Sequence, residues 1–173
     1  MQVNAKHINP FIEAAMKVVK QVAGIDVRRG HLSYKQKVEP TLQVSIIIGI
    51  YGFLCGQVVY SLDGHLAEKM VDKLLEGRSP AEKKIMFLDS LGEVANMITG
   101  NATVLLNQGP EFSLNITTPA IAAGTNISVH LVPKPALVLG LITVHGPIEI
   151  SISLEQKDAL TEISGLEEAL SEV

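Results

Sequence analysis

Four residues that could carry chemistry lie on one stretch of the sequence, at successive spacings of four, three and four: Asp89, Glu93, Asn96 and Gly100. In an α-helix, about 100° per residue places them within roughly 60° of one another, so they form one polar stripe. A carboxylate supplies negative charge, and a primary amide supplies both a donor and an acceptor without titrating. Gly100 has no side chain, so a partner surface could approach the helix backbone there.

The alternative interpretation of such a stripe is a solvated helix face, which is the usual role of polar residues at this spacing. Two features argue against it here. Asn96 and Gly100 are poor helix-interior residues at positions where Lys, Glu or Ala would stabilise more. The stripe also lacks the alternating Glu/Lys pairs of an ordinary exposed face.

The helix that carries the stripe has clear boundaries in the sequence. Ser79-Pro80-Ala81-Glu82 is a capping box with proline at the first helical position, and Gly109-Pro110 is a strong stop. The spacing predicts a single helix of about 28 residues between them. Its buried side is predicted to consist of apolar residues opposite the stripe: Leu88, Leu91, Ala95, Ile98, Ala102 and Leu105.

The remaining elements predict an α/β protein of the α+β kind, a sandwich of helices packed on a mainly antiparallel sheet. A first helix is expected to be capped by Asn9, to have Pro10 at its first position and to end at Gly24. A second helix is predicted over 65–76, after an Asp63-Gly64 turn. Strands are predicted on both sides of the long helix, with a Gly146-Pro147 turn between the last two: 27–37, 41–50, 57–62, 112–117, 127–132, 137–144 and 148–154. These elements predict one domain over 1–154 and an acidic amphipathic tail or helix over 155–173.

Composition excludes several classes of function. The chain has 173 residues, a net charge of −4 and no cluster of Lys and Arg, which argues against nucleic-acid binding. Its most apolar run, 44–55, is too short to insert across a membrane. The lone Cys55 favours a reducing compartment, so a cytoplasmic location is expected. The five histidines form no ligand pair, and no Walker A loop or Gly-x-Ser-x-Gly elbow is present, so we expect no metal or cofactor of its own.

Asp89-x3-Glu93-x2-Asn96, followed after 22 residues by Pro119, resembles the signature of the CheC/CheX/FliY chemotaxis phosphatases. All four positions match with the spacing intact. The resemblance covers about residues 3 to 154 and is closest to the CheX type.

The resemblance implies a CheX/CheC-like fold and a phosphatase that hydrolyses the aspartyl phosphate of a CheY-like response-regulator receiver domain. Asn96 would orient the attacking water, and Glu93 would contact the receiver's lysine near the phosphate. Asp89, Gly100 and Pro119 would support the motif. Mg²⁺ and the lysine belong to the receiver, so the phosphatase need only supply a positioned dipole and an anchoring carboxylate.

The resemblance also implies a homodimer, with sheets joined edge to edge, and one active site per chain, because the first helix has Met16 where a second Asn would be needed. Two other functions stay open at this point. The fold could be a binding module that docks a receiver or a flagellar-switch component without catalysis. It could also be a structural dimerisation domain with a solvated stripe.

Overall fold

A computed structural model describes residues 5–36, 42–107, 113–124, 129, 131 and 135–156. Its helices and strands follow in this order: α1 Ala5–Ala23, β1 Arg28–Lys35, β2 Val44–Gly52, β3 Leu54–Leu62, α2 Gly64–Leu74, α3 Pro80–Ile85, α4 Phe87–Leu106, β4 Leu114–Ile116, β5 Ala120–Ala123, β6 Ala136–Thr143 and β7 Gly146–Gln156.

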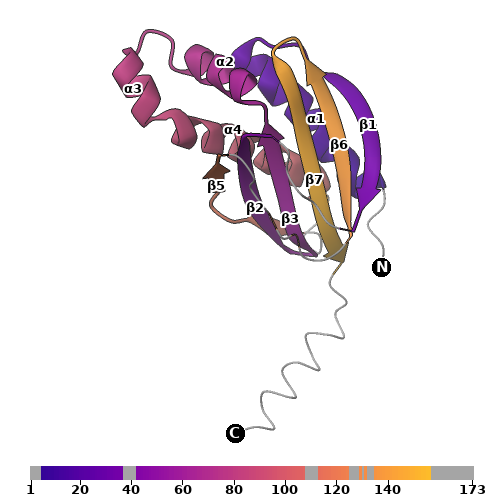
Figure 1. Ribbon diagram of the computed structural model, residues 1–173. Helices are drawn as coiled ribbons and strands as arrows, with labels where there is room; N and C mark the ends of the chain where they lie inside the picture. Colours follow the sequence, from indigo (N-terminus) through magenta and orange to yellow (C-terminus); the bar gives the residue numbers. More distant parts are fainter. Residues whose placement is uncertain are drawn as a thin grey trace, which may run out of the picture.

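The strands form one seven-stranded sheet with helices packed on one face, which confirms the predicted fold class (Figure 1). The strand order is β1-β6-β7-β3-β2-β4, and β5 pairs with β2 alongside β4. Every pairing between these strands is antiparallel. The strands predicted over 41–50 and 57–62 are present as β2 and β3, which pair as an antiparallel hairpin with Val44 opposite Leu62.

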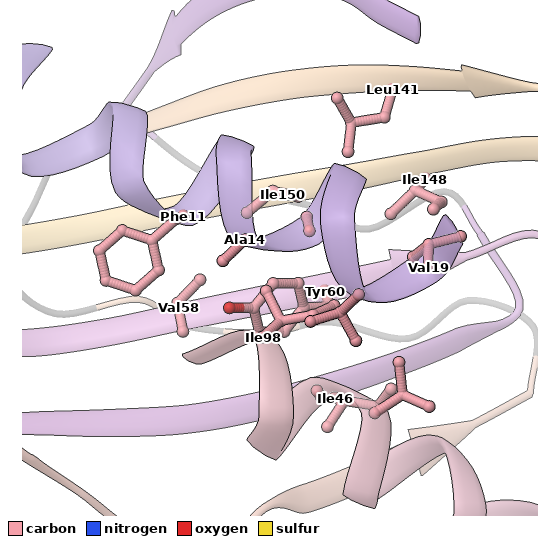
Figure 2. Close-up of a cluster of buried hydrophobic side chains, with 14 of the residues drawn as sticks. Phe11, Ala14, Val19, Ile46, Val58, Tyr60, Ile98, Leu141, Ile148 and Ile150 are labelled. Carbon is pink, nitrogen blue, oxygen red and sulfur yellow. The ribbon is translucent and has the colours of Figure 1, made fainter. Parts of the chain in front are cut away.

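The main core lies between the sheet and the helices. Alternate residues of each central strand point to this face, as the two-residue period of a strand requires. Phe11 and Val19 of α1 are buried against this face, together with Val58 of β3 and Ile150 of β7 (Figure 2). A smaller cluster on the opposite face of the sheet contains Val59, Leu131, Ala136 and Val138.

The first helix differs from its prediction at its N-terminal end. α1 begins at Ala5, so Pro10 lies inside the helix and Asn9 is no cap. Proline there removes one backbone hydrogen bond and crowds the preceding turn. The turn before it nevertheless stays helical, and Ile8 on that turn is buried in the main core. Tertiary burial of this kind outweighs local preference.

The predicted long helix is two helices. α3 ends at Ile85 and α4 begins at Phe87, with Met86 between them at φ −88° and ψ 3°. α3 has no buried residue, whereas α4 packs on the core, so the first turns have no packing that would keep them on the axis of α4. The predicted capping box is confirmed, because the Ser79 hydroxyl accepts from the Glu82 N–H and the Glu82 carboxylate accepts from the Ser79 N–H.

The predictions of burial at two positions near the ends of α4 are wrong. Leu88 is 39% exposed and Leu105 is 48% exposed. The buried side of α4 instead includes Gly92, Thr99 and Thr103, each of which directly follows a residue that was predicted to be buried. The side of the helix that faces the core is therefore rotated relative to the prediction. The four central positions are confirmed as buried: Leu91, Ala95, Ile98 and Ala102.

The strands after α4 also depart from prediction. The predicted strand over 127–132 lies largely outside the described residues, and neither of the two described positions within it, Val129 and Leu131, belongs to a strand. β5 was not predicted. The turn between β6 and β7 is formed by Val144 and His145, and β7 already begins at Gly146. The predicted tail lies outside the described residues except for 155–156, which continue β7.

None of the helices within the described ranges is long and apolar enough to cross a membrane.

Candidate functional site

The polar stripe lies on the outer side of α4. The helix buries Leu91, Ala95 and Ile98 against α1 and the sheet, which fixes the direction in which its other side points. The Asp89 and Glu93 side chains are exposed, and Asn96 and Gly100 are half-buried. The structure therefore brings the four predicted stripe residues together on one accessible side of one helix.

The amide of Asn96 has no hydrogen-bond partner in the described part of the chain, and neither does the Glu93 carboxylate. Asn101 on the same helix behaves differently, because its Nδ2 donates to the Met97 carbonyl at 2.9 Å. An amide that donates to a backbone carbonyl of its own helix has its donor occupied within that helix. An amide that stays free on an accessible stripe keeps both its donor and its acceptor for an incoming group.

Gly100 leaves open space at the end of the stripe. A Cβ atom built at this position meets no heavy atom within 4 Å. Its backbone has no positive φ, so the fold itself does not require glycine here. The missing side chain instead leaves the helix backbone accessible one turn after Asn96.

Pro119 lies beside the stripe and packs against α4. A Cβ atom built at Gly92 would stand 3.7 Å from the Pro119 Cβ and 3.1 Å from the Ile121 Cδ1. Gly92 immediately precedes Glu93, so the loop before β5 packs on the helix backbone beside the stripe. Gly92 was not among the predicted site residues, although a glycine inside a helix can signal close approach of another segment.

The loop that carries Pro119 is tied to the sheet through Thr117. The Thr117 hydroxyl accepts from the Gly49 N–H at 2.9 Å, and the Thr117 N–H donates to the Gly49 carbonyl at 3.0 Å. Gly49 belongs to β2, and a Cβ there would come within 2.8 Å of the Thr117 Cγ2. The sheet thus holds this loop in place, and the loop holds one side of α4.

This contact gives a first prediction. Gly92→Val is expected to push Pro119 and Ile121 away from α4 and to lower the free energy of unfolding by about 1–3 kcal/mol, as overpacking does in cores. Gly100→Val adds the same side chain to the same helix where space is open, and should cost less. Urea unfolding of the two variants would measure the difference. Equal destabilisation would show that Pro119 does not pack on α4 as described.

A groove of about 420 Å³ lies between α2 and the α3–α4 junction. It contains neither Glu93 nor Asn96. Within it, the Lys83 ammonium donates to the Asp72 carboxylate at 2.9 Å, and this hydrogen bond and the lysine charge hold the pKa of Asp72 below its ordinary value. This pair joins α3, which has no buried residue, to α2. Among the described residues, no group of three or more His, Cys, Asp or Glu side chains is arranged to hold a metal ion.

Comparison with known proteins places this helix and its sheet in one family. Residues 44–138 match the family described as chemotaxis phosphatase CheX. The CheY-P phosphatase CheX of Thermotoga maritima is 25% identical over 126 residues, which cover 73% of this chain and 81% of that protein. The matched family segment contains β2, β3, α4 and Pro119.

Solved structures agree with this assignment. The chemotaxis protein CheX of a Desulfovibrio desulfuricans subspecies has a TM-score of 0.76 and 26% identity, covering 86% of this chain and 99% of that one. A structure of the CheX–CheY–BeF3–Mg²⁺ complex from Borrelia burgdorferi has a TM-score of 0.71 and 26% identity, covering 87% of this chain and 98% of that one.

Proposed function

Because the chain belongs to the CheX family of chemotaxis phosphatases, we propose that it hydrolyses the aspartyl phosphate of a CheY-like response-regulator receiver domain, with Asn96 orienting the attacking water and Glu93 anchoring the receiver. The observation that carries the proposal is the amide of Asn96, which is half-buried on the accessible stripe of α4 and has no hydrogen-bond partner among the described residues. It lies one helical turn after the Glu93 carboxylate, which has none there either. The relative from Thermotoga maritima is named a CheY-P phosphatase, and the Borrelia burgdorferi structure is a complex of CheX with CheY.

The chemistry suits a residue that cannot titrate. Water attacks phosphorus, the bond from phosphorus to the aspartyl oxygen breaks, and the aspartate leaves as a carboxylate that needs no proton. Such a reaction depends on alignment and charge neutralisation more than on a strong base. An amide can accept a hydrogen bond from the water and donate one to a phosphoryl oxygen, which aligns the two reactants.

The receiver would supply the rest of the site. Its Mg²⁺ and its lysine neutralise the phosphoryl charge, so we propose no metal or cofactor for this chain. Glu93 would pair with that lysine. Gly100 would let the receiver surface lie close to the α4 backbone, while Asp89 and Pro119 would support the two sides of the docking surface.

The test is direct. Candidate receivers are phosphorylated with a small-molecule phosphodonor and Mg²⁺, and the loss of aspartyl phosphate is followed with and without this protein. Faster loss for one receiver, proportional to the amount of this protein, would support the proposal and identify the substrate. Binding to a receiver without any faster loss would instead favour a non-catalytic receiver-binding or flagellar-switch adaptor.

The role of Glu93 gives a second prediction. Glu93→Gln keeps the shape of the side chain and removes its charge, so it should weaken binding of the receiver, raising KM by about tenfold, with a smaller effect on kcat. Asp89→Asn removes a charge from the same stripe one turn earlier and serves as the matched control, with a smaller effect on KM expected. Titration of KM against salt concentration checks the cause, because a lost ion pair flattens the salt dependence. Equal KM values for the two variants would remove Glu93 from its anchoring role.

We also propose a homodimer formed by joining sheets at their edges. In the described sheet, β1 forms one edge, and β4 and β5 form the other. β1 has exposed Arg28 and Arg29, and charged residues oppose pairing of edge strands. The edge formed by β4 and β5, which come from the C-terminal half of the chain, is therefore the better candidate for the dimer interface. Sedimentation equilibrium would reveal a monomer if this proposal is wrong.

A further inference from the structure

We infer that Tyr60 is a positioning residue for Asn96, acting from the central strand β3 through Thr99 of α4. The inference rests on the proposed function for its catalytic consequence, and on the hydrogen bonds of the described residues for its geometry. Tyr60 does not touch the stripe. It acts on the helix that carries the stripe.

A chain of two hydrogen bonds joins the sheet to α4 below Asn96. The Tyr60 hydroxyl lies 2.9 Å from the Thr99 Oγ1, and the Thr99 Oγ1 donates to the Ala95 carbonyl at 2.8 Å. Thr99 has a single hydroxyl hydrogen, which that second bond uses. Tyr60 must therefore be the donor to Thr99, and the direction of the chain is set from the sheet to the helix.

The phenol is suited to this task because it stays protonated at physiological pH. The Tyr60 side chain is 2% exposed and Thr99 is fully buried. Burial raises the pKa of the Tyr60 hydroxyl far above its ordinary value, although the bond to Thr99 acts the other way. A buried donor of this kind keeps its bond across the whole physiological pH range, and a bond in a dry interior is expensive to break.

The two α4 residues that take part in these hydrogen bonds lie on either side of Asn96 in the sequence. Ala95 precedes it by one residue, and Thr99 follows it by three. Both contacts lie on the buried side of α4, whereas Asn96 lies on the accessible side. Tyr60 projects from a strand paired on both sides, by β2 and β7, so its ring stands on the most constrained part of the sheet.

The apolar packing around Tyr60 is close but not directional. A small apolar void of about 10 Å³ adjoins Tyr60, Ala95 and Ile98. Figure 2 shows the Tyr60 ring next to Ile98 of α4, with its hydroxyl oxygen as a polar atom among hydrocarbon side chains. Apolar contacts resist separation of helix and sheet but only weakly fix the roll of a helix about its axis, whereas a hydrogen bond is directional.

A small roll matters at the stripe. A side-chain atom about 6 Å from the helix axis moves about 1 Å when the helix rolls by about 10°. Misplacement of a reacting group by about 1 Å can cost up to about 100-fold in rate. The Tyr60 hydroxyl would therefore control the rate of hydrolysis while leaving the exposed docking surface unchanged.

The decisive variant is Tyr60→Phe, which removes the donor and leaves the Thr99 hydroxyl bonded to Ala95. The matched control is Ser45→Ala, because Ser45 and Ser61 share another buried hydroxyl pair at 3.1 Å on the neighbouring strands β2 and β3. Ser61 is the next residue along β3 after Tyr60, so it points to the opposite face of the sheet, away from α4. Both variants lose one buried hydrogen bond, but only Tyr60→Phe changes the contact with the helix.

We expect Tyr60→Phe to lower the rate of receiver dephosphorylation at saturating enzyme by about threefold to tenfold, with affinity for the beryllium-fluoride-loaded receiver within twofold of the native chain. Ser45→Ala should leave both values unchanged. Thr99→Ser should retain activity because it keeps both bonds, and Thr99→Val should lose at least as much as Tyr60→Phe. The double variant that combines Tyr60→Phe with Thr99→Val should be no slower than Thr99→Val alone, since both substitutions break the same hydrogen bond between the sheet and α4.

A second measurement needs no phosphatase activity. The ¹H–¹⁵N signals of the Asn96 side-chain amide, and of the backbone over 95–100, should shift in Tyr60→Phe and stay in place in Ser45→Ala. A native rate for Tyr60→Phe together with unmoved amide signals would overturn the inference. If the native chain accelerated no receiver, the proposed function would fail, and the amide signals alone would decide whether Tyr60 positions Asn96.

Discussion

Asn96→Ala should reduce the rate of receiver dephosphorylation by about 100-fold or more, toward the spontaneous rate of the receiver, because one well-placed group that acts in the transition state contributes an effect of this size. Affinity for the receiver should stay within about threefold, since the change removes a single amide from the docking surface. The two values come from the loss of aspartyl phosphate at saturating enzyme and from titration against the beryllium-fluoride-loaded receiver.

Asn101→Ala is the matched control for this change. It removes the same amide from the same helix, five residues later, at a position where the amide bonds to the Met97 carbonyl and lies off the stripe. It should retain full activity. If both asparagine variants were active while the native chain was a phosphatase, the attacking water would be held by another residue, and Asn96 would be an interface residue only.

The parts of the fold that follow from local pattern were predictable from the sequence. The capping box at Ser79 and the pairing of β2 with β3 each depend on a few neighbouring residues, and each is present. Helix α2 begins where the Asp63-Gly64 turn was predicted, with Asp63 as its N-cap and Gly64 already helical. The stripe was predictable for the same reason, because a spacing of four, three and four places residues on one side of any α-helix.

The parts that could not be predicted depend on contacts between distant segments. Three of the four residues of β5 are alanines, which have low preference for strands, and the segment is a strand because it pairs with β2. The break at Met86 has no glycine or proline to mark it, and it arises where packing on the core begins. The contact of Pro119 with Gly92 joins residues 27 positions apart, and the bond of Tyr60 to Thr99 joins residues 39 apart.

These distant contacts explain why the motif spans both α4 and the loop before β5. The stripe carries the polar groups, and the helix that bears it is contacted by Tyr60 through Thr99 and by Pro119 beside Gly92. A helix with the same stripe and without these two contacts would present the same residues with less control over their position. The spacing from Asn96 to Pro119 thus places the proline beside the helix that carries the asparagine.

Gly100→Ala should change the stability of the fold and the affinity for the receiver in opposite directions. Alanine is favoured over glycine in a helix interior by about 1 kcal/mol, and a Cβ here meets no atom within 4 Å, so the free energy of unfolding should rise by up to that amount. The same methyl group would stand on the stripe one turn after Asn96, where the receiver is proposed to approach the backbone. Affinity for the receiver should therefore fall by about tenfold, and Gly100→Leu should lower it further.

The opposite signs are what make this variant informative. A substitution that damages the fold lowers the free energy of unfolding and the affinity for the receiver together. One that blocks docking on an intact helix lowers the affinity alone. Urea unfolding and receiver titration of Gly100→Ala separate these cases. A more stable protein with native affinity would mean that the receiver does not reach the α4 backbone, and that the open space after Asn96 has no part in recognition. A more stable protein with weakened affinity would show that this position sacrifices helix stability so that the receiver can approach, which a purely solvated face would have no reason to do.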